Sequence, residues 1–173
     1  AVAYDEGPIA FRYPRGEAAG SDQPHGMRPL QIGKGRILRE GTDVAILSLG
    51  ARLEAAMMVA QMLAGHGVEA TVADARFCKP LDIQLVEALA NHHPLLITVE
   101  EGAIGGFGSH VLQHLASCDL LAGTRFRALT LPDRFIAHGS PAEQLSDSGF
   151  DASGIVEAVL AALQVGTRRL GTV

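Results

Sequence analysis

Tryptophan is absent from this chain, and aromatic residues make up only 5% of its 173 positions. An excess of basic charge is missing too, because 19 Asp and Glu outnumber 14 Lys and Arg and give a net charge of −5. A protein that binds nucleic acid clusters Lys and Arg to neutralise phosphates, whereas here only Arg168 and Arg169 are adjacent. The composition therefore argues against nucleic acid as a partner.

Long apolar runs and paired cysteines are also missing. No stretch approaches the ~18 apolar residues of a membrane-spanning helix, and the first 16 residues lack the apolar core of a secretory signal. Only Cys78 and Cys118 are present, and neither belongs to a CxxC motif or has a histidine at ligand spacing. Sparse thiols are typical of a reduced compartment, so we expect a cytoplasmic protein whose two thiols are buried and reduced, with a disulfide as the alternative.

The motifs of several enzyme classes are absent as well. No serine lies in a GxSxG turn, and no glycine-rich loop carries the Lys-Ser/Thr pair of a P-loop. His110 and His114 lie four residues apart but lack the Glu of HExxH. His92 and His93 end a predicted helix, where imidazoles can meet the last carbonyls. We therefore expect no metal ligand in this chain.

What the sequence does contain is a regular alternation of apolar strands and amphipathic helices. The strands are continuously apolar, which predicts a mostly parallel sheet covered on both faces and an α/β fold of three layers, α/β/α. A capping box with Pro141 in first position predicts a further helix start at Ser140. Strands are expected at Gly35–Glu40, Val44–Leu49, Val68–Ala73, Leu95–Val99 and Phe126–Leu131, and helices at Arg52–Ala64, Ile83–Asn91 (capped by Asp82), Ser109–Ser117 and Ala152–Leu163.

The two ends of the chain do not continue this alternation. Ile9–Tyr13 reads as a strand with no partner before it, so we expect that the sequence was cut from a larger protein. Residues 17–28 are rich in turn formers and predict a linker. Residues 165–173 have no core pattern and are expected to form a flexible tail.

One strand ends on two carboxylates, Glu100 and Glu101, and runs into the glycine-rich turn 102–108. In an open α/β sheet this turn lies at the carboxyl ends of the strands, where ligands bind. Adjacent residues on a strand point to opposite faces, so the two carboxylates cannot form one acid/base couple, and one is expected to accept from N–H groups of the next helix. The spacing G-x-x-G-G-x-G fits neither a dinucleotide nor a P-loop motif. A turn for close packing is therefore favoured over a phosphate cradle.

Arg15 is the better candidate for binding chemistry. In Tyr13-Pro14-Arg15-Gly16 the proline stiffens the approach, the glycine allows a sharp exit, and the guanidinium suits bidentate binding of phosphate. An ordinary surface arginine is the alternative. His138, in a loop before the capped helix, has a role that the residues alone leave open.

Five segments of the chain carry a resemblance, and they occur in order along nearly its whole length. They are GPIAFRYPRG at 7–16, GKGRIL at 33–38, DARFCKPLD at 74–82, VEEGAIGGFGS at 99–109 and LPDRFIAHGS at 131–140. Together they are similar to the C-terminal part of the 1-deoxy-D-xylulose-5-phosphate synthases, thiamine-diphosphate enzymes of the transketolase family. A fainter similarity to β subunits of 2-oxo acid dehydrogenases, which also carry a VEEG-like turn, fits a shared C-terminal domain.

The resemblance implies a domain organisation and a function. Residues 1–16 would end a pyrimidine-binding middle domain, 17–34 would be a linker, 35–164 a transketolase C-terminal domain, and 165–173 the tail. The family's enzymes condense pyruvate with glyceraldehyde 3-phosphate and release CO2, which starts non-mevalonate isoprenoid synthesis and supplies a thiamine precursor.

The same resemblance assigns the site residues. Arg15 inherits contact with the acceptor phosphate, while thiamine diphosphate and magnesium belong to the remainder of a cytoplasmic homodimer. No catalytic, cofactor-binding or metal-binding residue is then expected in this chain, which alone should not turn over. The alternatives are a packing domain without catalytic residues, from a related 2-oxo acid dehydrogenase β subunit or transketolase, and a nucleotide-binding domain that uses the glycine turn.

Overall fold

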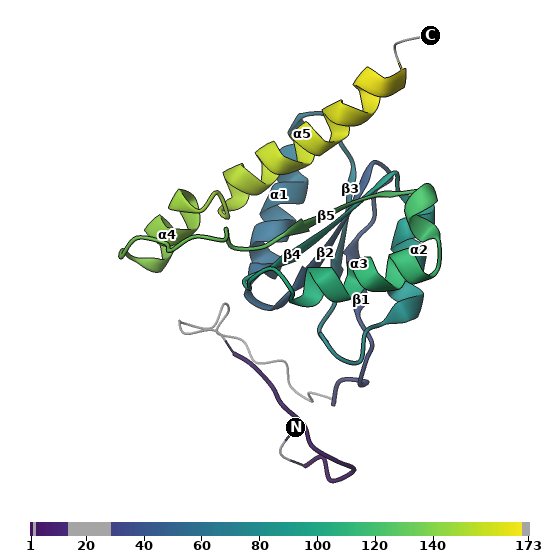
Figure 1. Ribbon diagram of the computed structural model, residues 1–173, viewed down its shortest axis with the longest axis vertical. Helices are drawn as coiled ribbons and strands as arrows, with labels where there is room; N and C mark the ends of the chain where they lie inside the picture. Colours follow the sequence, from purple (N-terminus) through teal and green to yellow (C-terminus); the bar gives the residue numbers. More distant parts are fainter. Residues whose placement is uncertain (2, 14–28, 171–173) are drawn as a thin grey trace. The chain divides into compact units, whose positions relative to one another are not determined.

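A computed structural model describes residues 1, 3–13 and 29–170 of the chain, with side chains up to residue 163 in the last helix (Figure 1). The chain divides into two compact units, Ala1–Leu30 and Gln31–Val173. In the described part of the first unit there is no helix or strand, so the strand expected at Ile9–Tyr13 is wrong. That part supplies no neighbouring strand to pair with its N–H and C=O groups, and Phe11 and Tyr13 are exposed. Arg15 lies outside the described residues.

A five-stranded sheet forms the middle layer of the second unit, in the order β1-β3-β2-β4-β5. Strands β2 to β5 are parallel, and β1 pairs with β3 in the antiparallel sense. The three inner strands are buried along almost their whole length, as their continuous apolar runs predict. The strands are β1 (Arg36–Arg39), β2 (Val44–Leu49), β3 (Ala70–Asp74), β4 (Leu95–Glu100) and β5 (Arg125–Leu129).

Helices cover both faces of this sheet (Figure 1). Helices α1 (Leu53–Gly65) and α5 (Ala152–Leu170) pack on one face, over a core that includes Ile46 and Ile97. Helices α2 (Ile83–His92) and α3 (Phe107–Ser117) pack on the other, around Leu47, Leu96 and Phe107. Each such fully buried side chain contributes about 1.5–3 kcal/mol. The expected three-layer α/β/α fold is confirmed; the shorter helices are η1 (Gly50–Arg52), η2 (Leu120–Ala122) and α4 (Pro141–Asp147).

Several element boundaries differ from the expected ones for local reasons. Strand β3 begins at Ala70 instead of Val68, because the N–H of Val68 donates to the Leu63 carbonyl and closes the end of α1. Gly67, at φ +74°, supplies the left-handed turn of this helix cap. Helix α3 begins at Phe107, before the expected Ser109. Helix α5 continues to Leu170, so the tail expected from residue 165 is helical to that point, where no proline interrupts it.

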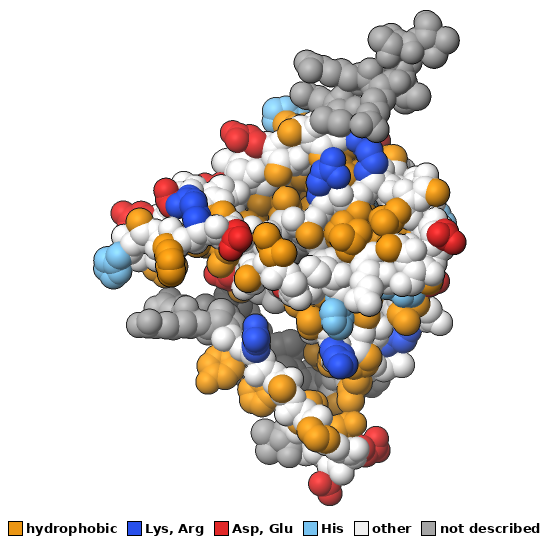
Figure 2. All heavy atoms as spheres, in the orientation of Figure 1, with side chains coloured by type: hydrophobic (Ala, Val, Ile, Leu, Met, Phe, Trp, Pro, Cys, Tyr) orange, Lys and Arg blue, Asp and Glu red, His pale blue; other side chains and the backbone are white. Residues whose placement is uncertain are grey.

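Both cysteines lie at the surface, contrary to the prediction that they are buried. Cys78, between β3 and α2, and Cys118, just after α3, are both exposed, so the prediction that they are buried is wrong. Figure 2 shows acidic and basic side chains distributed over the visible face, with hydrophobic side chains gathered between α5 and α3. Among the described helices, none combines the length and apolar character that crossing a membrane requires.

Candidate functional site

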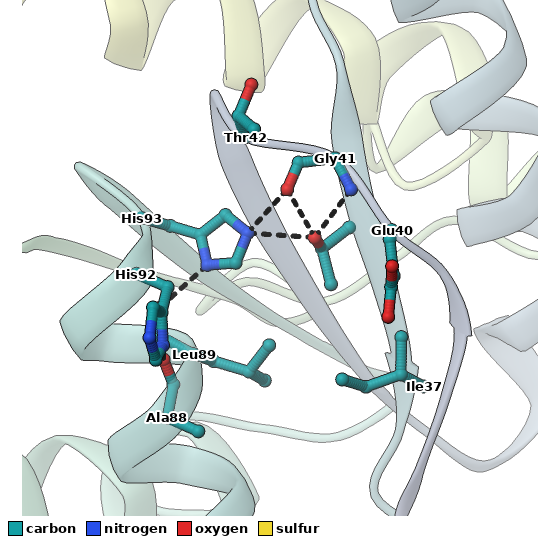
Figure 3. A pocket seen from close by; sticks show the side chains of 9 residues that line it. Ile37, Glu40, Gly41, Thr42, Ala88, Leu89, His92 and His93 are labelled. Atoms are coloured by element: carbon teal, nitrogen blue, oxygen red, sulfur yellow. Dashed lines mark hydrogen bonds between the residues drawn. The ribbon is translucent and has the colours of Figure 1, made fainter.

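A hollow of about 460 Å³ lies at the amino ends of the parallel strands, beside His93 (Figure 3). The imidazole Nε2 lies 2.8 Å from the Thr71 hydroxyl and 3.0 Å from the Gly41 carbonyl oxygen, and Nδ1 lies 2.9 Å from the Leu89 carbonyl oxygen. Both ring nitrogens are therefore engaged with the protein itself. His93 connects the end of α2 to β3 and to the loop between β1 and β2, which is a structural role.

His92 confirms the expectation that this pair meets the last carbonyls of its helix. Its Nδ1 lies 2.7 Å from the Ala88 carbonyl oxygen. For His93 the same expectation holds at Leu89, but Thr71 and Gly41 come from elsewhere in the sequence. The residue spacing within the helix could not predict that Thr71 and Gly41 contact His93.

The carboxyl ends of β2 and β4 form the switch point of the sheet. After β2 the chain turns through η1 into α1 on one face, and after β4 it turns into α3 on the other. Leu49 and Glu100 lie opposite each other in the register of these two strands. In open α/β sheets ligands bind in the crevice at such a point, so its side chains decide whether this chain holds a site of its own.

Glu100 fills the glycine turn that follows β4. Its carboxylate is buried and accepts a 2.8 Å hydrogen bond from the N–H of Gly108, at the start of α3. A Cβ atom on Gly106 would lie 2.6 Å from Glu100 Oε2, and one on Gly102 would lie 2.9 Å from it. The expected carboxylate bond to the next helix is confirmed. The space left by the missing side chains of these glycines is occupied by the carboxylate of Glu100.

Glu101 turns away from Glu100 and pairs with another residue. Its Oε2 lies 3.6 Å from Nε of Arg52, so an ion pair connects the loops after β2 and β4. Arg52 Nε is buried and, among the described residues, has no hydrogen-bond partner. The two carboxylates thus serve different partners, as expected, although β4 ends at Glu100 and Glu101 lies just after it.

This arrangement does not suit the diphosphate of a cofactor or nucleotide. The Gly108 N–H that would bind an anion is already used by Glu100, and the negative carboxylate would repel a phosphate that approached it. The glycine turn is therefore not a phosphate cradle.

The segments 33–38 and 74–82 meet at the start of α2. The Asp82 carboxylate accepts from the N–H of Gly35 at 3.0 Å and from the N–H of Leu85 at 3.3 Å, and Lys34 Nζ lies 3.4 Å away. Burial alone would raise the pKa of Asp82, but these hydrogen bonds and the Lys34 charge outweigh it and hold the pKa below its usual value. A Cβ on Gly33 would lie 2.9 Å from the ring of Pro80. The expected N-cap is confirmed, and both segments act in packing.

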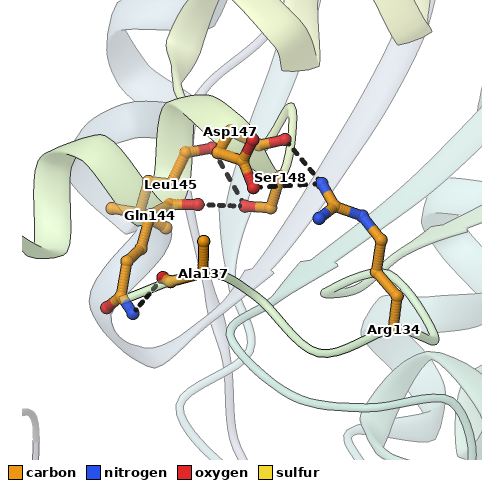
Figure 4. Close-up of polar contacts among 6 residues, drawn as sticks. All are labelled: Arg134, Ala137, Gln144, Leu145, Asp147 and Ser148. Atoms are coloured by element: carbon orange, nitrogen blue, oxygen red, sulfur yellow. Dashed lines mark hydrogen bonds and ion pairs between the residues drawn. The ribbon is translucent and has the colours of Figure 1, made fainter. Parts of the chain in front are cut away.

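The loop between β5 and α4 lies beside the glycine turn. Its first residues are held there by the N–H of Leu131, which donates to the Gly102 carbonyl at 2.9 Å. Further along, Arg134 donates to the carbonyl and carboxylate of Asp147, and Gln144 donates to the Ala137 carbonyl (Figure 4). The loop is therefore fixed at several points along its length.

The capping box at the start of α4 forms as the sequence predicts. The Glu143 N–H donates to the Ser140 hydroxyl oxygen, and the Glu143 carboxylate accepts from the Ser140 N–H at 2.8 Å. The hydrogen bonds from the N–H and hydroxyl of Ser140 lower the pKa of Glu143. His138, just before this box, is exposed in the loop.

Two large apolar side chains remain exposed at this carboxyl edge. Ile104, in the glycine turn, is 73% exposed, and Phe135, in the loop after β5, is fully exposed. Both stand on segments whose backbones are fixed by the contacts above. A surface that contacts another part of a protein is typically marked by a contiguous exposed apolar patch, so Ile104 and Phe135 are the residues at which this edge can be tested for one.

A third group of side chains was missed in the sequence. Glu87 of α2 lies beside His114 of α3 and Cys118 just after that helix, so the prediction that Cys118 has no histidine at ligand spacing is wrong. The signal was present, since His114 precedes Cys118 by one helical turn. The contribution of Glu87 depends on how α2 packs beside α3, which the spacing did not give.

The chain is similar to known proteins over most of its length. The profile of the family described as transketolase, C-terminal domain, matches residues 33–155. A solved structure of a split-gene transketolase, an inactive β4 tetramer, is 32% identical with a TM-score of 0.71 and is matched over 82% of this chain and 46% of its own. A transketolase mutant from Pichia stipitis, 19% identical with a TM-score of 0.58 and matched over 77% and 18%, shares the fold. This chain thus spans less than half the length of each of these two chains.

Proposed function

Because this chain belongs to the transketolase C-terminal domain family, we propose that it is the C-terminal part of a thiamine-diphosphate-dependent transferase. The family match over residues 33–155 is the observation that carries this proposal. The finer proposal, a 1-deoxy-D-xylulose-5-phosphate synthase, is supported by the five ordered segments from 7–16 to 131–140. Such an enzyme joins pyruvate to glyceraldehyde 3-phosphate and releases CO2.

In this proposal the chain supports an active site that lies largely outside it. The turn at the switch point is filled by Glu100, so its backbone is not free for a diphosphate. Thiamine diphosphate and magnesium are then held by the remainder of the enzyme, where the cofactor supplies the chemistry of pyruvate decarboxylation. The edge that carries Ile104 and Phe135 is the surface proposed to pack against that remainder.

Arg15 is the residue of this chain proposed to meet substrate. A guanidinium presents paired N–H donors that match the oxygens of a phosphate, and the acceptor aldehyde carries such a group. Arg15 thereby orients the acceptor and takes no part in breaking bonds.

The relative described as an inactive β4 tetramer of a split-gene transketolase supports a division of labour of this kind. We expect the isolated chain to be inactive in the same way, and to gain activity only with the missing N-terminal part. Assembly with that part and with a second subunit is the corresponding proposal for its partners.

A complementation assay tests the proposal. The chain is incubated with pyruvate, glyceraldehyde 3-phosphate, thiamine diphosphate and magnesium, with and without a separately produced N-terminal part. We expect no turnover by the chain alone, and release of one CO2 per deoxyxylulose phosphate in the mixture. Turnover by the isolated chain would contradict the proposed location of the site.

The same two parts, supplied with a ketose phosphate or with lipoamide in separate assays, separate the alternatives. Transfer from a ketose phosphate without use of pyruvate would indicate a transketolase. Pyruvate decarboxylation coupled to reductive acylation of lipoamide would indicate a 2-oxo acid dehydrogenase. Either outcome would keep the family and replace the finer function.

A further inference from the structure

Three side chains of the kinds that bind metal ions converge where α3 ends beside α2. They are Glu87, His114 and Cys118, whose potential ligand atoms all lie within 4.8 Å of one another. Cys118 directly follows the end of α3, four residues after His114, and Glu87 comes from the neighbouring helix α2. Glu87 and His114 are partly buried and Cys118 is exposed, so the group is shaped by the protein and still open to solvent.

The contacts converge on a single atom, Nε2 of His114. It lies 3.0 Å from Glu87 Oε1 and 3.9 Å from Cys118 Sγ. In a catalytic triad the nucleophile and the carboxylate face opposite ring nitrogens, so that the imidazole is oriented by one and takes a proton from the other. Here both face the same nitrogen, so this group does not have the geometry of a thiol nucleophile with its base.

We propose that Glu87, His114 and Cys118 bind a divalent transition-metal ion of the zinc class, with water in the fourth position. Thiolate, imidazole and carboxylate are all ligands of zinc, and three protein ligands with one water is an established coordination. Around a tetrahedral ion with bonds of ~2.0 Å to N and O and ~2.3 Å to S, ligands are separated by about 3.3 Å (N to O) and 3.5 Å (N to S). The two separations in this chain, 3.0 and 3.9 Å, are close to these values.

The contact between Glu87 and His114 already connects α2 to α3, and a bound ion would strengthen this connection. It would tie α2 to the end of α3 through three bonds, and because the folded chain alone assembles the three ligands, it would stabilise that state. This site would also replace the sequence-based expectation that the chain holds no metal ligand. It does not depend on the proposed function.

Cobalt(II) titration of the reduced chain tests the site, since this ion enters zinc sites and is visible spectroscopically. We expect a near-ultraviolet thiolate-to-cobalt band and visible bands of a tetrahedral ion, saturating at one ion per chain and lost when zinc is added. Cys118→Ser should abolish the near-ultraviolet band. His114→Gln and Glu87→Gln should each weaken cobalt binding at least about tenfold, which corresponds to 1.4 kcal/mol.

Matched controls come from the other cysteine and from the histidine one turn earlier. Cys78→Ser and His110→Gln should leave both the band and the affinity unchanged, and circular dichroism of each metal-free variant verifies its helices. Absence of a saturable band in the unchanged chain, or its persistence in Cys118→Ser, would overturn the proposal. If Cys118→Ser does not fold, Glu87→Gln decides, because unchanged cobalt affinity in that variant also overturns the site.

Discussion

Gly106 shows how closely a backbone and a carboxylate can approach when a side chain is missing. A Cβ there would lie 2.6 and 2.8 Å from the two oxygens of Glu100. The carboxylate is buried and bound to the Gly108 N–H, so it cannot move without losing that hydrogen bond. Gly106→Ala should therefore lower the free energy of unfolding by about 1–3 kcal/mol, as measured by urea denaturation.

A double-mutant cycle separates this contact from a general effect of alanine. Glu100→Ala alone also destabilises, because the Gly108 N–H loses its acceptor, but it removes the carboxylate with which the added methyl group would collide. The two changes together should cost about 1 kcal/mol less than their sum. Gly65→Ala, at the end of α1, is the control and should be neutral or slightly stabilising, because an added Cβ there would meet no atom outside the backbone of its own helix within 4 Å. Strict additivity would show that Glu100 does not constrain Gly106.

Arg15 carries the prediction closest to substrate. In the complemented enzyme, Arg15→Ala should reduce kcat/KM for glyceraldehyde 3-phosphate. The expected reduction corresponds to a loss of roughly 2–4 kcal/mol of transition-state binding. The loss should disappear with unphosphorylated glyceraldehyde, because that acceptor has no phosphate for the guanidinium to bind. An equal loss with both acceptors would point to a structural role, and unchanged kinetics would remove Arg15 from the site.

At the scale of the elements, the charge of the Asp82 carboxylate stabilises the start of helix α2. Asp82 has a lowered pKa in the folded chain, so its stabilising contribution is complete above the unfolded value of about 3.9 and is lost as the pH falls through the lower folded value. Asp82→Asn keeps one side-chain oxygen for the N-cap but loses the charge and one of the two oxygens that accept from the N–H groups of Gly35 and Leu85. It should cost about 1–2 kcal/mol at pH 7.

The pH dependence checks this explanation. The difference in unfolding free energy between the unchanged chain and Asp82→Asn should be constant from about pH 7 to pH 5 and should shrink below about pH 4. Asp133→Asn removes the same charge from an exposed position in the loop after β5 and is the control. A difference for Asp82→Asn that does not change with pH would mean that its charge does not stabilise α2.

The elements also show what local sequence can and cannot predict. The Ser140 capping box, the Asp82 cap and strand β2 follow from residue types and spacing over a few positions, and each is confirmed. Partners from distant segments, such as Thr71 for His93, depend on the order in which strands and helices pack. The exposure of both cysteines was missed for a related reason, since the thiol side chain alone does not place a residue inside the core.

At the scale of the whole second unit, periodicity predicted the three layers but not the strand order. Apolar runs imply burial on both faces, and the sheet confirms it. The antiparallel pairing of β1 with β3 has no such signal, because β1 is mostly exposed and only four residues long. The position of Glu87 beside His114 likewise follows from how α2 and α3 pack on that sheet.

The carboxyl edge of this unit gives the prediction that concerns assembly. Phe135 is fully exposed on a loop whose backbone is fixed by Arg134 and Gln144. Its replacement should leave the isolated chain nearly as stable as before, within about 0.5 kcal/mol. If the edge packs against the remainder of the enzyme, the same replacement removes a buried aromatic contact from that interface, where such contacts carry much of the binding energy.

Phe135→Ser should therefore raise the concentration of chain needed for half-maximal complementation by about tenfold, which corresponds to 1.4 kcal/mol. Met58→Ser is the matched control, because Met58 is also exposed but lies within helix α1 and not in the loops after β4 and β5. Complementation at saturating chain should reach the same maximum rate with either variant, since neither residue is assigned to substrate. Equal half-maximal concentrations for both variants would place the contact with the remainder of the enzyme on another surface.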